Sequence, residues 1–242
     1  MKKVAIIIST YNEENNINKM YKEVIDSIDT NNYLFNICFV DDGSVDNSYN
    51  KIKELMDKDD KVKVLKFKRN FGHEMAMIAG VDNFKDYDYY ILLDCDLQHP
   101  PKYIMSIVKA LDDNHDIVLM RRERNDSRSA ITSFFSELYY DLFNLIFREN
   151  FEKNASDFMA FNNDIANIVR NKYRYKNRLL RYIIQRVSKN RIIIDYTPEK
   201  RFSGESKYSF IKYSKLALQS IKSVMLLNNE SKLNDLYYEI EK

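Results

Sequence analysis

The sequence predicts one α/β domain of the nucleotide-binding type, with a mostly parallel central sheet flanked by helices. Its 242 residues suffice for one sizeable domain and are few for two, and 45% of them are hydrophobic. Through the first half of the chain, short apolar runs alternate with helical patterns, as in sheets whose parallel strands are joined by helices. The expected strands span residues 4–9, 35–40, 62–67, 89–93 and 117–120, and the expected helices span about 14–29, 46–57, 73–84 and 101–112.

The first expected strand imitates a secretion signal. Lys2 and Lys3 precede the apolar residues 4–8, but five apolar residues fall short of the roughly 7–15 that a signal peptide needs. We therefore interpret this run as a buried strand. No uncharged apolar run approaches the roughly 20 residues that cross a bilayer, and the two cysteines form no C-x-x-C. These features predict a cytoplasmic protein, peripheral at the inner face of the membrane where it contacts one.

Each of the first four expected strands is followed by a polar cluster. In sheets of this kind, ligands bind beyond the carboxyl ends of the strands, so functional residues are expected there. The clusters are Ser9-Thr10-Tyr11-Asn12-Glu13, Asp41-Asp42-Gly43-Ser44, Lys68-Arg69-Asn70-Phe71-Gly72 and Asp94-Cys95-Asp96-Leu97-Gln98-His99-Pro100-Pro101.

The second half of the chain is less regular. An apolar and aromatic helical pattern covers residues 130–147, and a further helix is expected at about 209–227. Residues 165–194 include nine Lys or Arg and no Asp or Glu, the strongest charge asymmetry of the chain. This basic run is either a solvated helix face or a surface for an anionic partner such as a membrane. The two apolar stretches either touch a membrane or pack into the core or a homodimer interface.

The glycines and the charge balance exclude several common classes. Only four glycines are present, where average usage near 7% would give roughly seventeen. None has the spacing of a dinucleotide fingerprint, a Walker A loop or a nucleophile elbow. With 38 Lys or Arg against 36 Asp or Glu, the net charge gives no reason to expect nucleic acid as a partner. We expect His73 and His99 to make local hydrogen bonds and to bind no metal.

Asp94, Asp96 and Gln98 form a candidate cation site. They alternate directly after an apolar strand, so in extended geometry their oxygens could meet at one ion. Carboxylate and amide oxygens suit Mg²⁺ or Mn²⁺ better than zinc. An isolated D-x-D is more often an acidic turn, but the three other polar clusters favour the cation site.

Asp41 and Asp42 allow two interpretations. They can form an Asx-type turn that caps the next helix. They can also accept hydrogen bonds from the base or the ribose of a nucleotide.

The polar clusters belong to a longer series of motifs. The series is STYNEENN (9–16), VDDGSVDNS (40–48), KRNFGHEMAMIAG (68–80), DCDLQHPP (94–101), SDFMAF (156–161) and RFSGESKYS (201–209). It resembles the family 2 glycosyltransferases of the GT-A fold, and most of all their polyprenyl-phosphate branch, which includes dolichyl-phosphate mannose synthases and undecaprenyl-phosphate glucosyltransferases. The resemblance implies a glycosyltransferase domain at residues 1–220, followed by a helical or polar tail at 221–242 without a transmembrane segment.

The resemblance also implies roles for individual residues. The nucleotide site would be lined by Thr10, Tyr11, Glu13, Asp41, Asp42 and Asp94. Mg²⁺ or Mn²⁺ would be held by Asp94, Asp96 and Gln98. The acceptor phosphate would meet Arg121, Arg201, Ser206 and Lys207, and the expected catalytic residues are Asp96, Arg121 and Asp157. Two positions depart from the family pattern, with Ser9 in place of the usual Pro and Met159 in place of a frequent Arg.

The implied reaction is the inverting transfer of a sugar from a UDP- or GDP-sugar to a polyprenyl phosphate. A cation and Arg side chains can stabilise the charge that develops on the leaving diphosphate. A phosphate acceptor is already ionised near pH 7, with a second pKa near about 6, so Asp157 would mainly orient groups. The expected partners are the donor, the lipid acceptor, a membrane surface or membrane-anchored protein, and a second copy of the chain.

Two alternatives remain from the sequence. A related transferase could act on a saccharide or protein hydroxyl in surface-polysaccharide synthesis, with Asp157 as the general base. An inactive fold could use the basic run to bind a membrane surface or nucleic acid, although the intact cation triad argues against this.

Overall fold

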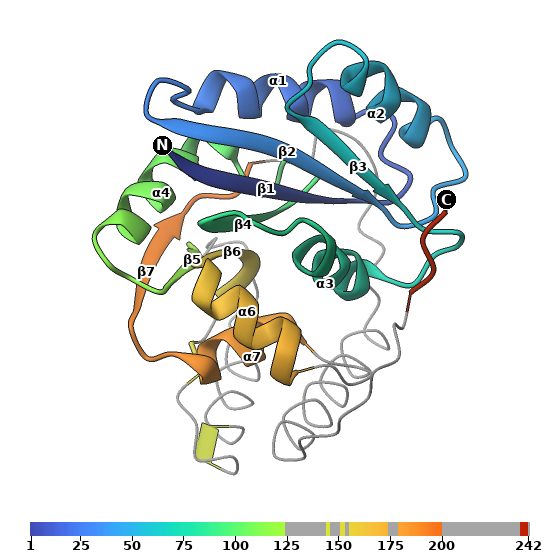
Figure 1. Ribbon diagram of the computed structural model, residues 1–242. Coiled ribbons are helices and arrows are strands. Elements are labelled where there is room, and N and C mark those ends of the chain that lie inside the picture. The colour runs from blue at the N-terminus through green and yellow to red at the C-terminus, as the bar shows by residue number, and fades with distance from the viewer. Residues whose placement is uncertain (124–143, 146–150, 153–154, 174–178, 200–237, 242) are drawn as a thin grey trace.

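The computed structural model describes residues 1–123, 144–145, 151–152, 155–173, 179–199 and 238–241. Within these residues, seven strands form one sheet in the order β3-β2-β1-β4-β6-β5-β7 (Figure 1). The strands are β1 (Lys2–Thr10), β2 (Tyr33–Asp41), β3 (Val62–Lys66), β4 (Tyr89–Asp94), β5 (Ile117–Arg122), β6 (Ala155–Asn162) and β7 (Arg191–Tyr196). All strand pairs are parallel except those of β6 with β4 and with β5.

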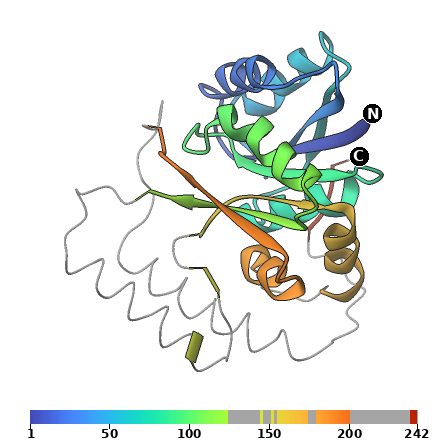
Figure 2. The same ribbon diagram turned by 90° about the vertical axis from the view of Figure 1, so that its left-hand side faces the viewer.

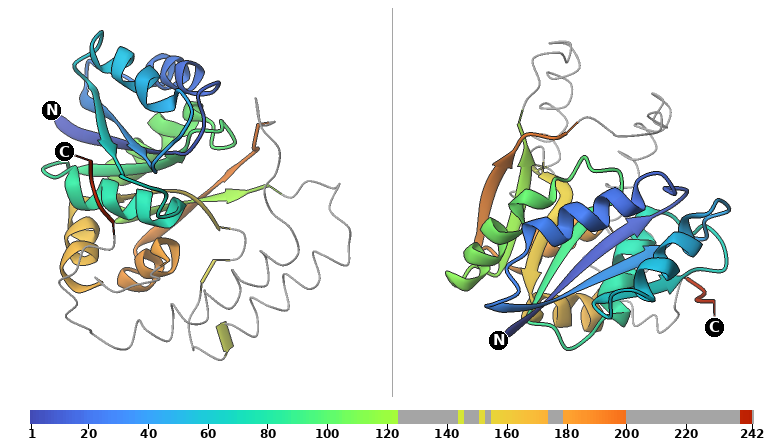
Figure 3. Two further views of the ribbon diagram at one scale, coloured as in Figure 1. Left: turned by 90° about the vertical axis from the view of Figure 1, so that its right-hand side faces the viewer. Right: turned by 90° about the horizontal axis from the view of Figure 1, so that it is seen from above.

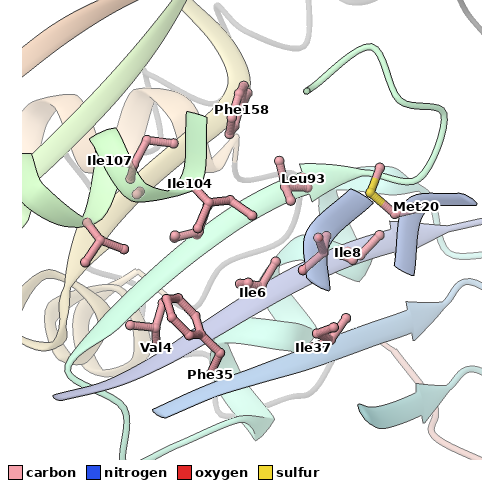
Figure 4. Packing of buried hydrophobic residues seen from close by; sticks show 14 of the residues in the cluster. Val4, Ile6, Ile8, Met20, Phe35, Ile37, Leu93, Ile104, Ile107 and Phe158 are labelled. Carbon is pink, nitrogen blue, oxygen red and sulfur yellow. The ribbon is translucent and has the colours of Figure 1, made fainter. Parts of the chain in front are cut away.

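Helices cover both faces of the sheet, which is why β1 is apolar along nearly its whole length. Val4, Ile6 and Ile8 pack into one core cluster (Figure 4), and Ala5 and Ile7 pack into the other. The first cluster lies under α1 (Ile17–Ser27), α2 (Ser48–Met56) and α4 (Ile104–Asp112), which follows the short 3-10 helix η1 (Pro101–Tyr103). The second lies under α3 (His73–Asn83), α6 (Asn163–Lys172) and α7 (Leu180–Val187). Figure 2 shows the two helical layers on opposite sides of the sheet.

The predicted α/β fold is confirmed. Each of the five expected strands and four expected helices is present, although the helix expected at 101–112 begins with a 3-10 turn. α3 lies close to β1 because Gly80 has no side chain, since a Cβ there would lie 2.4 Å from Cγ2 of Ile7. This close approach holds the second half of α3 against β1.

The basic run at 165–194 is divided among several elements where the structure describes it, and residues 174–178 lie outside the described residues. It contributes to α6, α7 and β7, and two of its cations are used inside the protein. Buried Arg170 donates to the carbonyl oxygens of Val81 and Phe84 and to the hydroxyl of Tyr90. Arg181 is largely buried as well and faces Asp157. Neither expected interpretation of the run therefore holds for these two residues.

A short C-terminal segment, residues 238–241, lies beside the end of β3 and against α3 (Figure 3). Ile240 forms an antiparallel bridge with Phe67, and the amide of Lys68 donates to the carbonyl of Glu239. The buried ring of Tyr238 stacks on Phe67. The predicted domain end at residue 220 lies outside the described residues, as do most of the 130–147 stretch and the whole of the 209–227 helix. Among the helices that the structure describes, none has the length and apolarity to cross a membrane.

Candidate active site

The carboxyl ends of β1, β2 and β4 meet at one edge of the sheet, as the sequence predicts. Strand register pairs Thr10 of β1 with Asp41 of β2. It also pairs Ser9 of β1 with Asp94 of β4. Three of the four polar clusters therefore begin side by side, and the fourth is joined to them through Asp42.

Asp41 presents a carboxylate oxygen with no partner. The residue is fully buried, and its Oδ1 accepts a hydrogen bond from the amide of Ser44 at 3.3 Å. Its Oδ2 has no hydrogen-bond partner among the described residues. Burial raises the pKa of Asp41. Because a buried acceptor without a donor is unfavourable, Oδ2 is suited to an N–H or O–H group of a ligand.

Asp42 fixes one loop to another. Its Oδ1 accepts from the amide of Phe71 at 2.7 Å, and its Oδ2 accepts from the amide of Gly72 at 2.9 Å. Burial raises its pKa to about 6, although the two amide hydrogen bonds oppose this. The adjacent Gly43 has φ +69°, and a Cβ there would lie 2.4 Å from the backbone carbon of Arg69. The loop after β2 therefore packs directly on the loop after β3.

The loop after β1 is held by the turn that follows Asp42. The amide of Asn12 donates to Oγ of Ser44 at 3.0 Å, and the amide of Glu13 donates to Oγ of Ser48 at 2.8 Å. Thr10 is buried, whereas Tyr11 is 36% exposed. Thr10 thus lies beside Asp41 in the sheet, and the loop with Tyr11 and Glu13 packs on Ser44 and on Ser48 at the start of α2.

Asp94 is the last residue of β4, and Asp96 lies in the turn that follows. Asp94 is half-buried, and its Oδ1 accepts from Oγ of Ser9 at 3.1 Å. Asp96 is buried, and its Oδ1 accepts from the backbone amide of Gln98 at 3.0 Å. Leu97, directly after Asp96, has φ +65°, so residues 95–98 form a turn and not the extended alternation that the sequence predicts.

These donors fit a cation that is shared with a ligand. Mg²⁺ is commonly bound by one or two carboxylates together with water and substrate phosphates. Within the described residues, no three His, Cys, Asp or Glu side chains are arranged to hold a metal by themselves. Asp94 and Asp96 therefore suit an ion whose remaining ligands come from water and a diphosphate, and do not form a closed protein site.

His73 lies at the centre of a cluster that the sequence did not reveal. It is the first residue of α3. Its Nδ1 lies 2.9 Å from Oγ of Ser9 and 3.3 Å from Oδ1 of Asp94, and its Nε2 lies 3.6 Å from Oδ2 of Asp157. Asp157, on β6, also has its Oδ1 3.4 Å from Nε of Arg181. His73 does make local contacts, as expected, but they join the ends of β1, β4 and β6.

Opposite charges set the protonation of this cluster. Burial would raise the pKa of Asp157, but Arg181 and His73 lower it below its ordinary value. Burial would lower the pKa of His73, but Asp94 and Asp157 raise it to about 10. Burial raises the pKa of Glu74 to about 7, and its Oε2 accepts from the amide of Leu180 at 3.1 Å. Asp157 is thus held as a carboxylate between two cations, which makes it a weak proton acceptor.

Arg121, the predicted phosphate ligand, is held by two acidic side chains. At the end of β5, its Nε and Nη2 donate to the two carboxylate oxygens of Asp195 at 2.6 and 2.9 Å. Its Nη1 donates to Glu152 at 3.0 Å. A phosphate at Arg121 would have to share the guanidinium with these carboxylates. The other predicted acceptor residues, Arg201, Ser206 and Lys207, lie outside the described residues.

Solved structures with a similar arrangement are nucleotide-sugar enzymes. Glucosyl-3-phosphoglycerate synthase from Mycobacterium tuberculosis, solved with Mn²⁺, UDP and its product, aligns with a TM-score of 0.67 at 12% identity, over 100% of this chain and 87% of that one. S. aureus TarS with UDP-GlcNAc aligns with a TM-score of 0.58 at 14% identity, over 93% and 66%. At these identities the likeness shows the fold, which is the expected GT-A fold.

Comparison of sequences finds relatives of higher identity. The putative glycosyltransferase CsbB of Bacillus subtilis is 30% identical over 207 residues, which are 86% of this chain and 62% of that protein. A prophage bactoprenol glucosyl transferase homolog of Escherichia coli is 30% identical over 91% of this chain and 72% of its own length. The bactoprenol glucosyl transferase of Shigella phage SfV is 29% identical over 91% and 71%. This chain therefore spans roughly two thirds of the length of these relatives.

The family model described as glycosyl transferase family 2 matches residues 5–166, which is more than half of the chain. The matched region runs from β1 into α6 and contains the three strand ends, His73 and Asp157. The chain belongs to glycosyl transferase family 2.

Proposed function

We propose that this glycosyltransferase transfers a sugar from a nucleotide-sugar to a polyprenyl phosphate, with inversion at the anomeric carbon. A single displacement by the acceptor oxygen inverts that carbon. The bond from the anomeric carbon to the diphosphate breaks as the bond to the acceptor oxygen forms. The leaving group is the nucleoside diphosphate.

The ionised state of Asp157 favours a phosphate acceptor over a hydroxyl acceptor. A hydroxyl acceptor must lose a proton, and a base for that purpose works best with a pKa near the working pH. Arg181 and His73 instead hold the pKa of Asp157 below its ordinary value. A phosphate monoester needs no such base, because it is already ionised at neutral pH. The bactoprenol glucosyl transferases among the relatives support the same class of acceptor.

The donor would bind over the ends of β1, β2 and β4. Asp41 would accept a hydrogen bond from the base or ribose through Oδ2, with Thr10, Tyr11 and Glu13 nearby, while Asp42 would hold the adjoining loop. Asp94 and Asp96, with Gln98, would hold Mg²⁺ or Mn²⁺. The bound cation would offset the negative charge that develops on the leaving diphosphate.

The acceptor phosphate would be bound by Arg121, Arg201, Ser206 and Lys207. Additional cations are needed because this phosphate enters beside a diphosphate that is already negative. The lipid chain would place the enzyme at the inner face of the membrane, on the lipid surface or on a membrane-anchored partner. Flotation with anionic vesicles at low and high salt tests this, and no flotation at low salt would contradict binding to the lipid surface.

A donor and acceptor panel tests the reaction. UDP- and GDP-sugars are offered with a short-chain polyprenyl phosphate, the matched polyprenyl alcohol or a free saccharide, and nucleotide release is measured with and without Mn²⁺. We expect the lipid phosphate to accelerate release and the alcohol to be inert. Faster release with the saccharide or the alcohol would overturn the phosphate assignment in favour of a hydroxyl acceptor.

A further inference from the structure

His73 contacts carboxylates on two strands of the site. Its Nδ1 lies 3.3 Å from Oδ1 of Asp94 on β4, and its Nε2 lies 3.6 Å from Oδ2 of Asp157 on β6. Oγ of Ser9 is 2.9 Å from Nδ1 and donates to the same Asp94 oxygen. The imidazole ring therefore spans the gap between the end of β4 and the neighbouring antiparallel strand.

The backbone of His73 is fixed from two directions. The amides of Phe71 and Gly72, directly before it, donate to Asp42. Further along the helix, Gly80 lets α3 pack against β1 so closely that no Cβ would fit. Because a rigid helix carries the ring, a movement of either carboxylate away from it would break a contact.

We propose that His73 is a positioning residue that sets the distance between Asp94, on the donor side, and Asp157, on the acceptor side. The proposal rests on the proposed function only in calling one side the donor side and the other the acceptor side. A five-membered ring with nitrogens at two positions can face two carboxylates at once, whereas an Asn side chain can reach only one of them. Displacing reacting groups by about 1 Å can slow a reaction about 100-fold. Loss of His73 should therefore lower kcat.

A double-mutant cycle tests this coupling. We expect His73→Ala to lower kcat about 10- to 100-fold and to change the KM for the donor less than threefold. If His73 acts through Asp157, the double variant His73→Ala/Asp157→Asn has the kcat of Asp157→Asn alone, because the interaction is already lost. Multiplying effects in the double variant, or a change confined to KM, would overturn the proposal.

Two further variants separate positioning from folding. His115→Ala, in the turn before β5, is the matched control and should keep wild-type kcat. If His73→Ala fails to fold, His73→Asn takes its place in the cycle, since its amide can keep the contact with Ser9 or Asp94 and lose the one with Asp157. A wild-type kcat in a folded His73→Asn variant would contradict the proposal.

A spectroscopic measurement is independent of the acceptor. The chain has three histidines, so the ring nitrogens can be assigned by substitution in a long-range ¹H–¹⁵N spectrum. Asp157→Asn should shift the His73 signals and leave those of His115 unchanged, and unchanged His73 signals would overturn the contact. If the wild type uses an acceptor other than polyprenyl phosphate, the acceptor assignment fails, and the same cycle with that acceptor still decides the role of His73.

Discussion

Nε of Arg181 on α7 lies 3.4 Å from Oδ1 of Asp157 on β6, and both side chains are largely buried. This pair accounts for the ionised state of Asp157, since burial alone would raise its pKa and Arg181 and His73 together lower it. Removing one partner of such a pair leaves a poorly compensated charge in the interior.

Replacing Arg181 by Met should therefore destabilise the protein. At pH 7 we expect the free energy of unfolding to fall by about 3 kcal/mol. Because the folded-state pKa of Asp157 is depressed, its stabilising contribution is present above the ordinary pKa, near about 3.9, and is lost as the pH falls below that value. The difference between Arg181→Met and wild type should therefore shrink as the pH falls below about 4, as measured by urea unfolding. Lys22→Met, which breaks an exposed pair with Asp26, should change stability by less than about 1 kcal/mol.

Replacing Asp96 by Ala should remove the main charge that holds the cation. We expect turnover to fall by orders of magnitude while the fold remains, because the charge on the leaving diphosphate loses its counter-ion. Nucleotide release measured over a range of Mn²⁺ concentrations, with circular dichroism as the control for folding, checks this. Near-normal activity of Asp96→Ala in the presence of a chelator would show that the cation assignment is wrong.

Replacing Asp41 by Asn should weaken donor binding more than it slows the reaction. The change removes one hydrogen bond to a charged acceptor, which contributes about 1.5–3 kcal/mol, so we expect a loss of affinity of about tenfold or more. A hydrogen bond to base or ribose persists from ground state to transition state, so kcat should change little. Calorimetry with UDP and GDP measures the affinity. An unchanged affinity for both nucleotides would remove Asp41 from the nucleotide site.

Asp42→Asn should change the pH dependence of stability. Since burial raises the folded-state pKa of Asp42 from 3.8 to about 6, its contribution is fully present below pH 3.8 and is lost as the pH rises through 6. The free energy of unfolding should therefore depend less steeply on pH between 4 and 6 in Asp42→Asn than in wild type. Asp26→Asn, on the exposed face of α1, is the control, and equal slopes in Asp42→Asn and wild type would contradict the prediction.

Replacing Gly43 by Ala should damage the nucleotide site through the backbone. A Cβ at this position would lie 2.4 Å from the backbone carbon of Arg69, so the loops after β2 and β3 must separate. Asn114 has nearly the same backbone angle, with φ +66°, but is exposed and lies far along the sheet from the site. Asn114→Ala should lower the free energy of unfolding by about 1–2 kcal/mol, because alanine tolerates the left-handed backbone poorly, and should leave UDP affinity intact. Gly43→Ala should lower both the free energy of unfolding and the UDP affinity. Equal effects on affinity would show that the close packing at Gly43 does not matter.

The sequence predicts the first half of the fold well because its strands are buried on both faces. Runs such as those of β1 and β4 can only be strands between helical layers, and each ends in a polar cluster. β6 and β7 were not predicted, since β6 enters between β4 and β5 from a distant part of the chain and its partners determine it. The same holds for the site. Asp41 and Asp42 look equivalent in sequence, and only the approach of Phe71 and Gly72 gives them different surroundings.

Contacts between distant segments also explain what was missed at His73 and Arg181. A lone histidine at the start of a helix predicts nothing about Asp157, and Arg181 is one of nine similar cations in the basic run. Serine at position 9, a departure from the family pattern, proves to be the hydroxyl that contacts both His73 and Asp94. Such a role depends on strand register, which the sequence does not contain.

The position of residues 238–241 in the chain affects when the edge of the sheet is completed during synthesis. β3 is one of the two outer strands of the sheet in the described part of the chain, and an open outer strand can pair with the strand of another molecule. A ribosome releases the chain from its N-terminus, so β3 leaves the ribosome long before Ile240 can pair beside Phe67. Ile240 and Glu241 then pair with the end of that edge, at Phe67 and Lys66, so a late part of the chain completes this corner of the sheet.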